Sequence, residues 1–154
     1  MDNVRRVVDI DAYMAAAGEL LERGESICLT VTGSSMAPFL VHGRDSVSLE
    51  RPRGPAKRGD ILLFRRESGR YVLHRVIKTE PDGSVYLVGD GRNEIEGPVA
   101  PEQAVAVAVR ACRKGRWIER GDFWWDFFAG AWLRLLPFRG ALRRLARFVP
   151  RRWR

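Results

Sequence analysis

The amino-acid sequence predicts a mainly β protein with a short N-terminal helix and a helical C-terminal tail. Short β-branched and apolar runs recur between Ile27 and Ile118, separated by Gly, Pro, Asp and Ser residues that favour turns. Helical spacing of apolar residues is found before and after this region. The chain of 154 residues is long enough to bury one core. We therefore expect an N-terminal amphipathic helix in residues 1–24, a β domain in residues 25–121 and a basic, aromatic tail in residues 122–154.

The first predicted element is a helix over residues 10–23. Its apolar side chains recur every three to four positions, as on one face of a helix: Tyr13, Met14, Ala17, Leu20 and Leu21. Asp9 or Asp11 can cap its start, and Gly24 suits its end. This helix is expected to pack on the β domain.

Short strands with frequent turns follow. They are predicted at residues 27–31, 47–49, 61–64, 71–78, 85–88, 104–111 and 117–118. Ser68 and Gly69 join the third and fourth of these runs as a hairpin. Residues 51–58 and 94–101 are rich in turn-forming and charged residues and are interpreted as loops.

The positive charge is concentrated at the C-terminal end. The chain has a formal net charge of +8, and residues 131–154 hold eight arginines and no acidic residue, so the preceding part is neutral. All five tryptophans lie from Trp117 onward. A neutral body with a basic, aromatic tail indicates an anionic surface as partner and argues against binding of nucleic acid by the body.

The tail is predicted to form two amphipathic helical segments that break at Pro137. After Gly140, apolar residues recur at helical spacing and arginines occupy another face: Leu142, Leu145, Ala146 and Val149 against Arg143, Arg144, Arg147 and Arg151. Such segments suit an anionic membrane interface. The alternative is that they pack on the body or on a partner protein.

Composition also restricts the compartment and the chemistry. Met1 to Asp11 is polar and charged, and no apolar run reaches the ~20 residues of a spanning helix. The expected location is cytoplasmic, with at most peripheral membrane contact. Cys28 and Cys112 lie in apolar runs and are expected to be buried thiols, with a single disulfide as the alternative. No metal or organic cofactor is implied.

Three motifs follow one another along the predicted strands. Gly33-Ser34-Ser35-Met36-Ala37-Pro38 forms a turn after the first strand, His74-Arg75-Val76-Ile77 lies on the fourth, and Gly89-Asp90 follows the fifth. Over about residues 27–109, this order resembles the serine peptidase clan that contains type I signal peptidases and the self-cleaving SOS-type repressors. The resemblance implies a β-ribbon catalytic fold for residues 25–121.

The resemblance implies that Ser35 is the nucleophile. A serine hydroxyl needs an adjacent base, which in most of these relatives is a lysine before an Arg-Val-Ile-like run. Here His74 occupies that position, as in the endoplasmic-reticulum and archaeal signal peptidases. Histidine titrates near neutrality and so suits a general base. The other histidine, His42, falls in a turn and is expected to be exposed and without a role.

A histidine base is usually oriented by a carboxylate. Asp90 and Glu96 are both candidates, and the sequence does not rank them. In the histidine-type relatives an aspartate follows the Gly-Asp pair by six residues, where this chain has Glu96. The oxyanion is expected to meet the backbone N–H of Ser35, with Ser34 and Met36 beside it in the substrate site.

The resemblance therefore implies a serine endopeptidase that cuts an extended peptide such as a leader or signal segment. The alternative is a catalytically silent, peptidase-like module that binds peptide and docks on a membrane or a partner protein. Type I signal peptidases carry a spanning anchor before the serine motif, whereas here a short amphipathic helix precedes it. Membrane attachment is accordingly expected from the tail.

Overall fold

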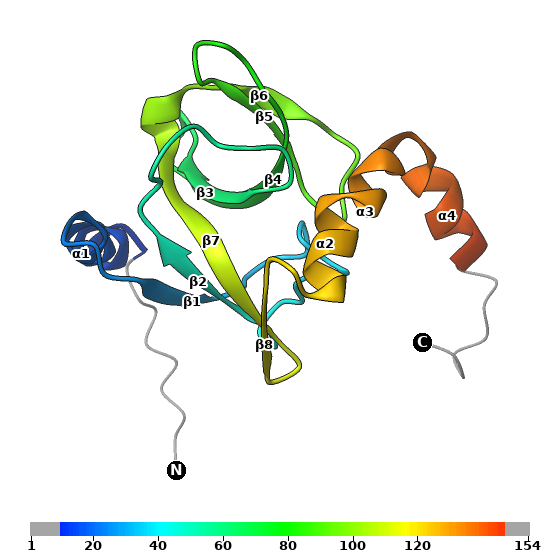
Figure 1. Ribbon diagram of the computed structural model, residues 1–154, viewed down its shortest axis with the longest axis horizontal. Coiled ribbons are helices and arrows are strands. Elements are labelled where there is room, and N and C mark those ends of the chain that lie inside the picture. The colour runs from blue at the N-terminus through cyan, green and yellow to red at the C-terminus, as the bar shows by residue number, and fades with distance from the viewer. Residues whose placement is uncertain (1–9, 147–154) are drawn as a thin grey trace.

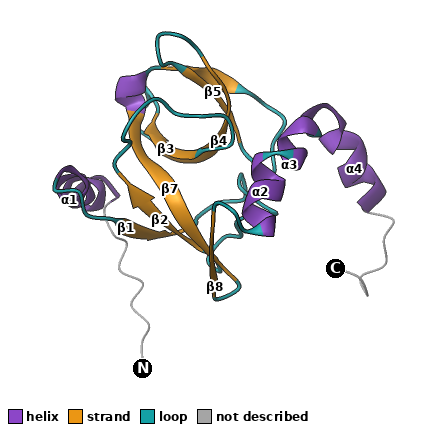
Figure 2. Ribbon diagram, viewed as in Figure 1, coloured by secondary structure: helices purple, strands orange, loops and turns teal. Residues whose placement is uncertain are grey.

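The computed structural model, which describes residues 10–146, has the predicted fold class (Figures 1 and 2). A strongly curved antiparallel sheet forms the body, with one helix at its N-terminal edge and three α-helices at the opposite side. Residues 1–9 and 147–154 lie outside the described part, and with them the predicted cap Asp9 and the last arginines of the tail.

Eight strands form a single antiparallel sheet. They are β1 (Ile27–Thr30), β2 (Ser46–Glu50), β3 (Ile61–Arg65), β4 (Tyr71–Thr79), β5 (Val85–Val88), β6 (Glu96–Val99), β7 (Ala104–Arg113) and β8 (Arg116–Glu119). Their order is β1-β2-β7-β3-β4-β5-β6, and β8 pairs with β7. The strands predicted from alternation correspond to β1–β5, β7 and β8, and the predicted β3–β4 hairpin is confirmed.

The strand β6 corrects the sequence analysis, which expected residues 94–101 to be a loop. Backbone pairing of Val85 with Val99 and of Leu87 with Glu96 joins β6 to β5. Its sequence, Glu-Gly-Pro-Val, shows no alternation of apolar and polar residues and contains a proline. An edge strand tolerates this composition because one side of its backbone needs no partner.

The helices are α1 (Ile10–Glu22), α2 (Phe123–Ala129), α3 (Ala131–Arg134) and α4 (Arg139–Ala146), with 3₁₀ turns η1 (Pro101–Gln103) and η2 (Leu136–Phe138). The buried side chains of Met14, Ala17 and Leu21 pack α1 on the main core, as predicted. The hydroxyl of Tyr13 also donates to the carbonyl of Cys28, at 3.3 Å, and ties α1 to β1.

The first tail segment packs on the body. Trp125, Phe128 and Leu133 of α2 and α3 are 3–4% exposed. Phe39 directly follows the turn formed by residues 33–38, called the serine turn below. The centroid of its ring lies 4.9 Å from that of Phe128 and 5.9 Å from that of Trp125. Such aromatic contacts supply much of the apolar burial that fixes a helix on a domain. For α2 and α3 the structure therefore favours packing on the body over a membrane interface.

The two cysteines are free, and the expectation of buried thiols is wrong for Cys28. Cys28 is exposed because side chains alternate along β1 and Cys28 lies on the face opposite to the buried Ile27, while Cys112 is half-buried. Within residues 10–146, no helix has the length and apolar character needed to cross a bilayer.

Candidate active site

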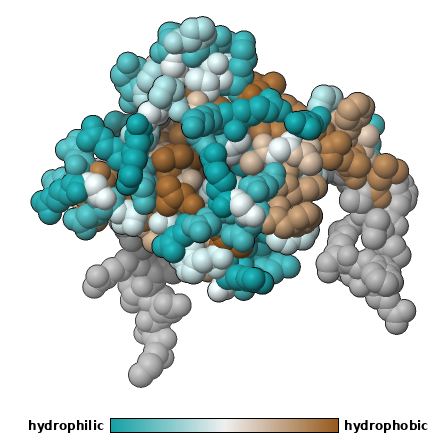
Figure 3. Space-filling model, viewed as in Figure 1, coloured by the Kyte–Doolittle hydropathy of each residue, from teal (hydrophilic) through white to brown (hydrophobic). Residues whose placement is uncertain are grey.

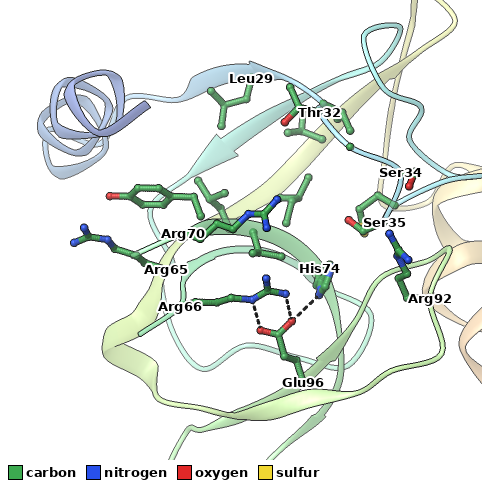
Figure 4. Close-up of a pocket in the computed structure, with 18 of the residues that line it drawn as sticks. Leu29, Thr32, Ser34, Ser35, Arg65, Arg66, Arg70, His74, Arg92 and Glu96 are labelled. Carbon is green, nitrogen blue, oxygen red and sulfur yellow. Dashed lines mark hydrogen bonds and ion pairs between the residues drawn. The ribbon is translucent and has the colours of Figure 1, made fainter. Parts of the chain in front are cut away.

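A single cleft collects residues of the serine motif and of the His74 motif, together with Glu96 (Figure 4). Its volume is about 1100 Å³, and Ser35, His74 and Glu96 all line it. Ser35 comes from the turn after β1, His74 from the middle of β4, and Glu96 from the start of β6. Ser34 and Met36 line the same cleft, as do the arginines Arg65, Arg66, Arg70 and Arg92.

The serine turn is held on the body by the buried side chain of Met36. Met36 is 1% exposed and belongs to the main core, whereas Ser35 is half-buried and Ser34 is exposed. The turn begins at Gly33, whose φ of 78° lies in the left-handed region that favours glycine. The N–H of Gly33 donates to Nδ1 of His42 at 2.9 Å. His42 is exposed as predicted, but it does have a role, because it holds the entry to this turn.

The Gly89–Arg92 turn packs directly against the backbone of the serine turn. The N–H of Gly91 donates to the carbonyl of Ser35 at 2.8 Å. A Cβ atom on Gly89 would collide with that same carbonyl, and one on Gly91 would lie 2.5 Å from the carbonyl oxygen of Ala37. The two turns pack so closely that only glycine fits at positions 89 and 91.

His74 is held in a nearly dry environment. It is 6% exposed, and its Nδ1 lies 3.5 Å from Oε1 of Glu96. This contact is electrostatic, since Nδ1 has no hydrogen-bond partner among the described residues. Burial lowers the pKa of His74, and this effect outweighs the nearby carboxylate of Glu96, which raises it.

Glu96 is held by an arginine that the sequence analysis did not single out. Arg66 donates from Nε to Oε2 at 2.7 Å and from Nη2 to Oε1 at 2.5 Å. These hydrogen bonds lower the pKa of Glu96, so its carboxylate is ionised at neutral pH. Arg66 lies on the exposed hairpin between β3 and β4, where an arginine gives no sequence signal of such a role.

Asp90, the other candidate carboxylate, forms an ion pair with Arg75. Its carboxylate accepts from Nε and Nη2 of Arg75 at 2.8 and 2.7 Å, and both side chains are fully buried. Arg75 also donates to the carbonyl of Gly59 at 2.9 Å. The pair links β4 to the Gly89–Arg92 turn. The structure thus brings Glu96 against the imidazole of His74, while the carboxylate of Asp90 bonds to Arg75.

The structure thus places a turn serine, a buried histidine and an ionised carboxylate in one cleft of a curved β sheet. The family model described as Peptidase S24-like matches residues 3–109, most of the chain. The chain therefore belongs to the Peptidase S24-like family, in the clan of the SOS-type repressors and signal peptidases. No curated protein matches the chain. The matched region includes the serine turn, β4 and β6, and ends before α2.

Proposed function

We propose that this protein is a serine endopeptidase in which Ser35 is the nucleophile, His74 the general base and Glu96 the orienting carboxylate. The observation that carries the proposal is the position of Glu96, whose ionised carboxylate faces Nδ1 of His74 inside the cleft that Ser35 lines. With Nδ1 directed at Glu96, Nε2 is the nitrogen left for the serine hydroxyl. We expect the distance of 3.5 Å to shorten to a hydrogen bond when substrate binds, because catalytic hydrogen bonds are often long in the unliganded enzyme.

The reaction follows from these roles. Oγ of Ser35 attacks the scissile carbonyl carbon while Nε2 of His74 accepts the hydroxyl proton. The negative charge formed on the carbonyl oxygen is stabilised by the backbone N–H of Ser35, with Ser34 and Met36 flanking the substrate. The imidazolium of His74 then protonates the leaving amine as the C–N bond breaks. A water molecule, deprotonated by His74, hydrolyses the acyl ester and restores Ser35.

Two backbone stretches beside the cleft, in β1 and β4, are unpaired on one side within residues 10–146 and could take up an extended peptide. β1 is an edge strand, and residues 71–74 of β4 pair with β3 but lie before the register of β5, which begins at Arg75. Residues of both strands line the cleft. A peptide added along either edge gains main-chain hydrogen bonds, which favours an extended substrate such as a leader or signal segment.

The tail supplies the proposed attachment to an anionic membrane surface. Figure 3 shows apolar surface on the side that carries α3 and α4. Phe138, Leu142 and Leu145 are 62%, 39% and 64% exposed, at the spacing of one helix face. All charged side chains in residues 131–154 are arginines, and this positive charge favours binding to anionic lipid headgroups over binding to a neutral surface.

The first experiment is labelling with a serine-directed covalent probe, measured by intact mass. We expect one adduct on the native chain and none on Ser35→Ala or His74→Ala. Ser26→Ala, which removes an exposed serine before β1, is the matched control and should react like the native chain. Glu96→Gln should react more slowly, because the imidazole loses its orienting group.

The alternative function predicts a different outcome. A folded native chain that forms no adduct and hydrolyses no extended peptide contradicts the peptidase proposal. Peptide binding without cleavage would then favour the catalytically silent module. An adduct retained in Ser35→Ala would place the reactive serine elsewhere.

A further inference from the structure

The C-terminal helices contact the turn that supports the nucleophile, although they lie outside the region matched by the family model. Nε1 of Trp132, in α3, donates to the carbonyl of Asp90 at 2.8 Å. Arg139, the first residue of α4, donates from Nη1 to the carbonyls of Gly89 and Arg92, both at 3.2 Å. Three hydrogen bonds therefore join α3 and α4 to the Gly89–Arg92 turn.

Arg139 is buried to an extent that is unusual for a charged side chain. It is 1% exposed, and its guanidinium lies over the ring of Trp132, 4.9 Å from the centroid. It also donates to the carbonyl of Trp132 at 3.0 and 3.3 Å. Burying a guanidinium is costly unless its N–H groups are bonded, so these carbonyls hold Arg139 in one position.

The supported turn transmits this restraint to Ser35. The N–H of Gly91 donates to the carbonyl of Ser35, and there is no space for a side chain between the two turns at Gly89 or Gly91. A displacement of the Gly89–Arg92 turn therefore displaces the backbone that carries the nucleophile. Because proteins pack closely, such a shift is not absorbed by empty space between the two turns.

We propose that Arg139 and Trp132 are positioning residues, and that residues 131–139 form a C-terminal strap that fixes the Gly89–Arg92 turn and, through it, Ser35. The strap makes a segment outside the matched family domain part of the scaffold of the active site. Its kinetic consequences rest on the proposed peptidase function, whereas its structural consequences do not.

The structural test is hydrogen–deuterium exchange on the full chain. In Arg139→Gln, we expect faster exchange in residues 33–37 and 89–92, with β2 and β7 exchanging as in the native protein. The exchange rates of Arg139→Lys in these residues should lie between those of Arg139→Gln and the native protein, because a lysine retains the charge but not the planar fork of donors. Arg110→Gln removes an exposed arginine on β7 and is the matched control, expected to exchange like the native chain.

The kinetic test uses the rate of serine-probe labelling and the steady-state hydrolysis of a peptide. Misplacement of a nucleophile by about 1 Å costs up to roughly 100-fold in rate. We expect Arg139→Gln to lower the labelling rate and kcat by about 10- to 100-fold, with KM changed much less. The activity of the variant should fall at the same acidic pH as that of the native chain, because the contact between His74 and Glu96 is untouched.

Unchanged exchange in both turns of Arg139→Gln would overturn the strap, whatever the activity. If that variant loses protection throughout the sheet, Trp132→Phe is the second test, because it keeps an aromatic ring at this position while it removes the N–H donor to Asp90 and part of the ring. Faster exchange confined to residues 89–92 and 33–37 in Trp132→Phe supports the strap, and native exchange there contradicts it. A native chain without serine reactivity would refute the peptidase function alone, because the exchange experiment still tests the strap.

Discussion

At the scale of single residues, the site depends on opposing influences on His74. Burial removes water from the imidazole and favours its neutral form, which is the form that accepts a proton from serine. The carboxylate of Glu96 acts in the opposite direction, and in the proposed reaction it would stabilise the imidazolium. Arg66 limits this second effect because it binds the same carboxylate and carries a positive charge close to His74.

The lowered pKa of His74 predicts the acidic limb of the pH profile. The limb of kcat/KM should lie below 6.5, the ordinary pKa of histidine. In Glu96→Gln the carboxylate that raises the pKa is gone and Arg66 is left unpaired, so the limb should move to lower pH while the plateau falls. Glu67→Gln, on the exposed hairpin, is the control and should keep the native profile. A limb above 6.5, or one that rises in Glu96→Gln, would contradict this account.

The same shift has a consequence for stability. Because the folded-state pKa lies below the unfolded value, the unfolded chain binds more protons as the pH falls through 6.5. The contribution of His74 is therefore complete above this pH and is lost progressively below it. Thermal unfolding between pH 7 and 5 should show a smaller loss of stability in His74→Phe than in the native chain.

The sequence singled out two of the candidate site residues but did not rank the two carboxylates. Ser35 and His74 were singled out by their motifs, but Asp90 and Glu96 were equivalent because both are carboxylates near the Gly-Asp pair. Their difference is three-dimensional: Asp90 faces Arg75, and Glu96 faces His74. Glu96 also lies on β6, the strand whose composition gave no pattern of alternation. The ranking therefore required a strand pairing that periodicity does not encode.

At the scale of elements, the site is assembled from segments that are distant in sequence. The Gly89–Arg92 turn is fixed on one side by the buried pair of Arg75 and Asp90 and packs on the other against the serine turn. Breaking a buried ion pair leaves a charge without its partner, so removing Arg75 or Asp90 alone would destabilise this turn. Strand periodicity predicted β4 and β5, but not that the loop after β5 would meet the loop after β1.

This packing predicts the effect of Gly89→Ala. The added Cβ would collide with the backbone carbonyl of Ser35, which cannot rotate away as a side chain would. We expect a loss of serine-probe labelling of about 10- to 100-fold, together with a lower melting temperature. Gly54→Ala is the control, since a Cβ there meets no atom within 4 Å, and it should label at the native rate. Native labelling in Gly89→Ala would show that the two turns can move apart.

At the scale of the whole molecule, charge and apolar surface divide the chain in two. The body up to residue 130 is neutral, and the excess positive charge lies in the tail. The apolar residues of that tail fall into a buried group and an exposed group. Trp125 and Phe128 are buried against Phe39, whereas Phe138, Leu142 and Leu145 are exposed. The helix α4, which carries the two leucines, lies on the side away from α1 (Figure 1). Composition showed the tail to be amphipathic, but only tertiary packing separates the two groups.

This division predicts binding to anionic membranes through α4. The chain should float with vesicles of phosphatidylcholine and phosphatidylserine at low salt and be released at high salt, because salt screens the arginine–headgroup attraction. Leu142→Glu with Leu145→Glu should weaken the binding at least about tenfold, since each leucine loses its apolar burial and gains a repelled charge. Leu20→Glu alters an exposed leucine of α1 and should bind like the native chain. Absence of flotation at low salt would contradict the membrane proposal, and binding that resists high salt and the α4 substitutions would exclude α4 as the docking surface.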